Sequence, residues 1–207
     1  MKKIIFSFLV IFLIITTSCI NIFHFIEVKN NKDLNVQFKL TLSKNLLELA
    51  SMKDEGSDFK NFLNMLDQYQ NMVDPRTKAE FIKIDNEREK GFIFKYTTDG
   101  SKMGENNEFF PYYSQDKKTL IINFPKNDGS IEFSEDEADY IKIILEQAKY
   151  TLLLKSFSPI RDIKVMIGGM IVDNIKFSKL SEDLYIIEVP FILFFLNLEN
   201  ISVMIQF

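Results

Sequence analysis

The sequence is poor in the residues on which most catalytic and metal-binding sites depend. Its 207 residues include one cysteine, Cys19, one histidine, His24, and no tryptophan. A single cysteine excludes a disulfide within the chain and a site built from several thiolates. A single histidine in an apolar stretch favours an ordinary strand or tether residue over a general base or a metal ligand. We therefore expect neither a metal nor another cofactor.

Basic residues are too few for a nucleic-acid role. The chain has 25 Lys and Arg residues against 29 Asp and Glu residues, which gives a formal net charge of -4. Nothing in this charge balance attracts a phosphate backbone, so nucleic acid is excluded as a partner. Hydrophobic residues make up 46% and charged residues 26% of the chain, a composition typical of a folded globular protein.

Known catalytic motifs are also missing. The sequence has no G-x-S-x-G elbow, no H-E-x-x-H helix, no phosphate-binding P-loop and no G-x-G-x-x-G turn. The carboxylates of Glu135, Asp136, Glu137 and Asp139 could hold a hard cation or act as acid and base. Their place at the start of an expected helix is already explained by the helix dipole. We predict a protein that is not an enzyme.

The amino-terminal segment carries the most specific pattern. Two lysines follow Met1, residues 4–15 form an apolar run, and residues 16–18 are small and polar before Cys19. This run is short for a bilayer span, which takes about 20 residues, and has the usual length of a secretory signal. The alternative is an uncleaved anchor that continues through residues 20–25.

This segment resembles the lipobox of bacterial lipoproteins, in which a cysteine after small residues is diacylated before the signal is cut ahead of it. The family usually has Leu three residues before the cysteine; Thr16 stands there in this chain, with Ile15 before it, as in spirochaete-type lipoproteins. The resemblance implies a signal peptide over residues 1–18 and lipid on Cys19, which would anchor the mature chain to the inner or outer membrane of the cell envelope. No long Ser-, Gly- or Asn-rich spacer follows Cys19, so we expect the domain to lie close to the membrane.

Apolar periodicity predicts a single α+β domain over residues 19–207. Residues 34–42 alternate between apolar and polar, as in a strand with one buried face, and residues 22–28 can pair with them as a hairpin. Helices are expected after the N-cap Ser43, over residues 57–73, and after the capping box at Ser134. We therefore expect a mainly antiparallel, curved sheet of hairpins with two or three packed helices. Strands at 79–84 and 91–96 are expected to form another hairpin through the charged turn 85–90. Further strands are expected at 119–124, 150–157, 163–167, 171–177 and 184–189, and a buried element at 191–198 before an edge or terminal strand at 201–207.

A second resemblance covers most of the mature chain. It is carried by the starting hairpin, the segment 36–50 (VQFKLTLSKNLLELA), a middle helix, and a tail that begins with YTLLL at 150–154 and ends at Pro159. Together these are similar to the LppM-type lipoprotein domain. The resemblance implies an α+β envelope module associated with lipid or glycolipid binding, and it assigns no binding residues, because it rests on pattern and not on an invariant motif.

An aromatic cluster stands out in the polar stretch 97–118. It comprises Phe109, Phe110, Tyr112 and Tyr113. These rings either fasten a long loop onto the core or, if exposed, form a rim that binds lipid or protein.

The leading hypothesis is a membrane-anchored, noncatalytic lipoprotein that binds an apolar or lipid ligand. The alternative is a structural or protein-interaction lipoprotein of the cell surface, whose partner is another envelope protein.

Overall fold

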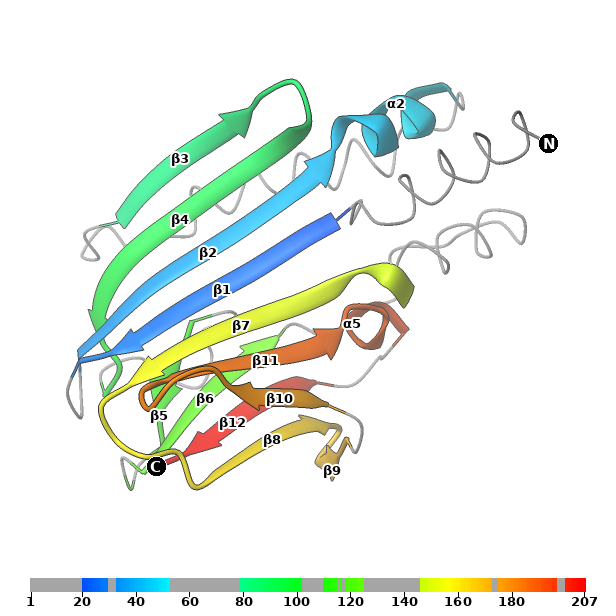
Figure 1. The fold of residues 1–207 in the computed structure, drawn as a ribbon. Coiled ribbons are helices and arrows are strands. Elements are labelled where there is room, and N and C mark those ends of the chain that lie inside the picture. Colours follow the sequence, from blue (N-terminus) through cyan, green and yellow to red (C-terminus); the bar gives the residue numbers. More distant parts are fainter. Residues whose placement is uncertain are drawn as a thin grey trace.

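Over the residues that it describes, a computed structural model shows two β-sheets and two short helices (Figure 1). The helix expected over 57–73 and most of the one expected after Ser134 lie outside the described residues. The structure describes residues 20–29, 33–52, 79–101, 110–114, 116, 118–124, 146–172, 175–196 and 200–207.

The larger sheet has seven strands, and its inner strand β1 (Ile20–Val28) joins parts of the chain that are far apart in sequence. β1 pairs antiparallel with β2 (Asp33–Ser43) and parallel with β7 (Lys149–Ser156). Every second side chain of β1 is buried, the period of a strand with one face in the core. The order across the sheet is β10 (Lys176–Lys179), β11 (Leu184–Pro190), β7, β1, β2, β4 (Glu89–Asp99) and β3 (Ala79–Asp85).

Side chains of the connecting residues explain where the first elements turn and begin. Asn86 Oδ1 accepts hydrogen bonds from the backbone N–H groups of Arg88 and Glu89, at 2.9 and 3.0 Å, and so closes the turn between β3 and β4. Ser43 Oγ accepts the backbone N–H of Leu46 at 3.2 Å and caps α2 (Lys44–Met52). The predicted hairpins β1–β2 and β3–β4, and the predicted cap of α2, are confirmed.

A second sheet of five strands shares its core with the larger one. Its central strand is β12 (Ile201–Gln206), which pairs antiparallel with β6 and β8. Buried side chains of both sheets form one hydrophobic cluster, in which the ring centroids of Phe124 and Tyr150 lie 4.9 Å apart across the two layers. The order across this sheet is β5 (Tyr112–Tyr113), β6 (Thr119–Phe124), β12, β8 (Asp162–Ile167) and β9 (Met170–Ile171).

The prediction of an α+β fold with packed helices is wrong, because the described chain is nearly all β. Two sheets of seven and five strands replace the single curved sheet, and the helices are short: α2 has nine residues and α5 (Ile192–Leu196) has five. The error has a physical cause. A strand with one buried face alternates in the same way whether a helix or another sheet covers that face, so alternation does not reveal what lies opposite.

Two predictions for the last third of the chain need correction. The single strand expected over 171–177 is divided between the two sheets, since β9 ends at Ile171 and β10 begins at Lys176. The last strand, expected at an edge or as a terminal strand, ends the chain but lies in the middle of its sheet. Its inward residues Ile201, Val203 and Ile205 are almost completely buried, as a central position requires.

Gly91 of β4 permits a close approach between β4 and β2. A Cβ atom at this position would lie 2.0 Å from the backbone oxygen of Leu40 and 2.7 Å from Cα of Thr41, so the backbone would have to shift. We expect Gly91→Ala to lower the free energy of unfolding by about 3 kcal/mol, measured by urea denaturation. Gly100→Ala is the control, because its Cβ would meet the side chain of Leu34, and not backbone, at 2.6 Å. An equal or larger loss in the control would contradict the prediction.

Candidate functional site

One end of the two sheets brings the first residues of β1 together with the end of the chain. In the larger sheet Asn21 of β1 pairs with Lys149 of β7, and Lys149 pairs with Pro190 of β11. α5 begins two residues after Pro190. We call this end, marked by Asn21, Lys149 and Pro190, the N-proximal end. The opposite end, where β7 stops at Ser156, is the distal end.

The smaller sheet reaches the N-proximal end as well (Figure 1). Ile201, the first residue of β12, pairs with Phe124 and with Ile167. The ring of Phe124 lies 4.9 Å from that of Tyr150, the second residue of β7, and 4.7 Å from that of Phe194 in α5. These contacts place the turn that follows Ile167 at the N-proximal end.

Cys19, the predicted lipid-attachment residue, lies outside the described residues, together with the predicted signal peptide 1–18. The next residue, Ile20, is described; it starts β1 and is largely buried. The larger sheet therefore begins one residue after Cys19. Within the described ranges no helix is long and apolar enough to cross a membrane.

The four aromatic residues considered as a binding rim do not lie together at the surface. Phe109 is outside the described residues. Tyr112 and Tyr113 form β5 and are buried, and burial raises the pKa of Tyr113 to about 12. Phe110 packs against Tyr96, with ring centroids 5.1 Å apart. The exposure that a rim requires is therefore not found at Tyr112 and Tyr113, which pack in the fold.

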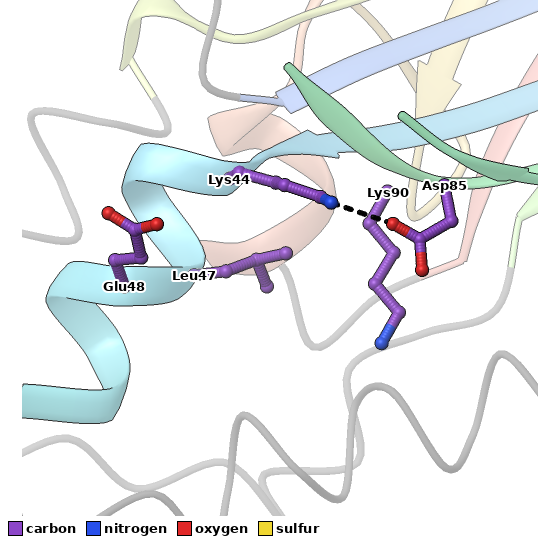
Figure 2. A pocket seen from close by; sticks show the side chains of 5 residues that line it. All are labelled: Lys44, Leu47, Glu48, Asp85 and Lys90. Atoms are coloured by element: carbon purple, nitrogen blue, oxygen red, sulfur yellow. Dashed lines mark ion pairs between the residues drawn. The ribbon is translucent and has the colours of Figure 1, made fainter. Parts of the chain in front are cut away.

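A shallow, open hollow of about 280 Å³ lies beside α2 and the ends of β3 and β4 (Figure 2). Lys44 Nζ lies 2.8 Å from Asp85 Oδ1, and its hydrogen bond lowers the pKa of the Asp85 carboxyl. Two cations and two anions therefore share a small space and compensate each other. The described residues that line the hollow include no Ser, Thr, Cys or His, and we assign it no ligand. It is lined by Lys44, Leu47, Glu48, Asp85 and Lys90.

The single histidine lies inside the core. His24 is fully buried, and its Nδ1 lies 2.9 Å from the hydroxyl oxygen of Tyr150. Its Nε2 and the hydroxyl of Tyr96 have no hydrogen-bond partner in the described part of the protein. Burial lowers the pKa of His24 to about 3, which keeps the imidazole neutral at neutral pH. Its ring packs edge-on against that of Phe38, with the ring centroids 5.6 Å apart. His24 is thus a strand residue, as expected, and substrate has no access to it.

Acidic side chains in the described segments pair with lysines across neighbouring strands. Lys155 Nζ lies 3.1 Å from Glu27 Oε1, and Lys39 Nζ lies 3.1 Å from Glu89 Oε1. In these segments no group of three or more His, Cys, Asp or Glu residues is placed to hold a metal ion. The carboxylates at 135–139, considered above for cation binding, lie outside them.

Comparisons with known protein families, with curated proteins and with solved structures found no match to this chain. The likeness to lipoproteins, including the LppM-type domain, therefore stays a prediction. Any function has to be argued from the residues and their geometry.

Exposed apolar side chains are the feature that the sequence interpretation missed. The large ones among the described residues all fall within residues 157–180. Three of them lie in expected strands, whereas Met170 and Leu180 lie outside the expected strands. A signal was present in the run 165–172 (VMIGGMIV), because no charged or polar side chain alternates with the apolar ones. These exposed residues are Phe157, Met170, Ile171, Phe177 and Leu180.

Burial of His24 makes stability depend on pH. Its pKa is about 3 in the folded protein against 6.5 for a histidine in an unfolded chain, so between these values the unfolded state binds more protons. The free energy of unfolding should therefore fall by about 1.4 kcal/mol per pH unit as the pH drops below 6.5, and His24 should have no effect above it. Denaturant titrations between about pH 5 and about pH 7 measure this slope. The lowered pKa of Glu27 places its titration below that window.

Two variants separate the titration of His24 from its packing. His24→Leu should abolish the pH slope, because the chain has no other histidine. Tyr150→Phe removes the hydrogen-bond partner and keeps the imidazole, so the slope should remain. A slope that persists in His24→Leu would contradict the assignment.

Proposed function

We propose that this protein is a noncatalytic cell-envelope lipoprotein, anchored through acylated Cys19, that acts as a protein-interaction module. One observation carries the proposal: β1, an inner strand of the larger sheet, begins at Ile20, next to the lipidation residue. Each buried CH₂ of an acyl chain contributes about 0.8 kcal/mol to membrane binding, so several chains on one cysteine hold a domain firmly. With no spacer after Cys19, the N-proximal end then faces the bilayer.

The distal end points away from the membrane in this arrangement, and its exposed apolar residues can meet a protein partner. Phe157 follows β7 and is 71% exposed, and Leu180 in the β10–β11 turn is 55% exposed. The two turns are joined by a hydrogen bond from the backbone N–H of Ser156 to the carbonyl oxygen of Asp183, at 2.8 Å. Contiguous exposed apolar patches mark interaction sites, and the proposal assigns these two side chains to one such patch.

A lipid ligand between the layers has less support. Aromatic rings from both sheets already meet in the described core, where the ring centroids of Phe124 and Tyr150 lie 4.9 Å apart. At that point the space between the sheets is filled by the protein's own side chains. We therefore favour an interaction surface over an internal carrier site.

Cys19→Ser tests the anchor in the full-length chain expressed in a bacterium that processes lipoproteins. The parent protein should begin at Cys19, carry a diacylglyceryl thioether, and sediment with membranes. Serine cannot form the thioether, so the variant should lose the acyl mass and the membrane association. Mass spectrometry of the amino-terminal peptide and membrane fractionation measure both. Ser18→Ala, which keeps a small residue before the cysteine, should behave like the parent.

Two results would contradict the anchor. One is a parent chain that carries no acyl group. The other is a Cys19→Ser chain that keeps residues 1–18 and stays on the membrane as firmly as the parent, which is the behaviour of an uncleaved anchor.

The double variant Phe157→Ser with Leu180→Ser tests the distal surface. A photoreactive residue introduced at Glu182, in the same turn, should cross-link to one envelope protein in intact cells. The double variant should reduce that cross-link at least several-fold and leave thermal stability unchanged, because both side chains are exposed. Glu87→Ser, at an exposed position in the β3–β4 turn at the other end, is the control. Equal cross-linking in all three proteins would exclude the surface.

A further inference from the structure

We propose that the β8–β9 hairpin is a second membrane contact, which inserts its tip into the lipid headgroup region. This inference rests on the proposed anchor at Cys19. It adds to that anchor a defined orientation of the domain on the bilayer.

The hairpin tip is a tight turn formed by two glycines. Gly168 and Gly169 have φ angles of 56° and 83°, which are characteristic of a two-residue type I′ turn. Met166 and Ile167 of β8 pair with β9 on the other side of the turn. A Cβ atom added at Gly169 would meet no other atom within 4 Å, so the tip projects into open space.

The projecting part of the hairpin is apolar. No residue from 165 to 172 (VMIGGMIV) carries a charge or a polar side chain. Met170 is 74% exposed and Ile171 is 56% exposed. In the sequence the run is flanked by Lys164 and Asp173. In β8, Lys164 Nζ lies 3.1 Å from Asp162 Oδ2. A hairpin with apolar side chains at its tip and charged ones at its base matches the boundary between headgroups and acyl chains, because the tip can enter the apolar layer while the charges stay among the headgroups.

The position of the turn is fixed by its contacts with the start of β12. Ile167 pairs with Ile201, and the backbone N–H of Gly168 donates to the carbonyl oxygen of Asn200 at 3.0 Å. The tip therefore belongs to the N-proximal end. Figure 1 shows β9 on the same side of the molecule as α5 and the first residues of β1.

Because the tip lies at the N-proximal end, we infer that the membrane is what the tip contacts. Acyl chains on Cys19 would lie one residue from Ile20 and would hold the N-proximal end at the bilayer, and the hairpin tip with it. Phe157 and Leu180 are comparably exposed but lie at the distal end. They therefore serve as matched positions that should stay in water.

The experiment uses the full-length, acylated protein in vesicles of three parts phosphatidylethanolamine to one part phosphatidylglycerol. Acylation blocks Cys19, so Met170→Cys provides a single thiol for an environment-sensitive fluorophore. Leu180→Cys is the control. The label at 170 should show a blue-shifted emission and be quenched several-fold more by nitroxide-bearing lipid than by aqueous iodide. The label at 180 should show the reverse preference.

The possible results distinguish a failure of the hairpin proposal from a failure of the anchor. An acylated, vesicle-bound protein whose label at 170 is quenched like the label at 180 overturns the hairpin proposal alone. If the blue shift increases with the amount of protein per vesicle and nitroxide-bearing lipid does not quench the label, the hairpin contacts a second copy of the chain. That result also overturns the hairpin proposal. A mature chain whose mass shows no acyl groups overturns the anchor and the hairpin proposal together.

Discussion

The parallel pairing of β1 with β7 is the constraint on which the rest of the structure depends. It joins residues more than a hundred positions apart, such as His24 and Leu152. Without it the larger sheet would divide into the β1–β4 hairpins and the strands β7, β11 and β10. Groups on both faces support the pairing: His24 lies within hydrogen-bond distance of Tyr150 in the core, and Glu27 pairs with Lys155 on the other face. Loop closure over this distance carries a large entropic cost, which only the shared core can offset.

The same pairing determines which chain segments share an end of the protein. Since β1 and β7 run in the same direction, the residue after Cys19 lies beside the start of β7 and the end of β11. From there α5 leads to β12, whose first residue lies beside the β8–β9 turn. The proposed anchor, the proposed membrane-inserting tip and the exposed distal residues are thus consequences of one strand arrangement. The anchor and the distal surface concern different residues and can fail separately, whereas the membrane-inserting tip depends on the anchor.

Local sequence patterns predicted the elements better than their assembly. The alternation in residues 34–42, the Ser43 cap and the two early hairpins were confirmed because each depends on residues close in sequence. The predicted fold class was wrong because a second sheet, and not a layer of helices, packs on the inner face of the larger sheet. That second sheet is formed by segments as distant in sequence as 119–124 and 201–206. For the site, the aromatic residues 110–113 were visible in the sequence, but whether they are buried depended on β5 pairing with β6. The exposure of Met170, which lies between the strands expected at 163–167 and 171–177, was missed because a local pattern does not show which apolar residues lack a covering layer.

The sequence by itself determined the scarcity of catalytic side chains, the acidic balance, the apolar run before Cys19 and most of the strands. These properties are read from composition or from residues a few positions apart. Only the tertiary structure decided that the chain folds as two packed sheets, that the single histidine is buried and neutral, and that Met170 and Leu180 are exposed at opposite ends. Which side chains are buried, and at which end of the protein they lie, depends on which distant strands pair. That pairing is determined by the packing of the whole core and not by any local pattern.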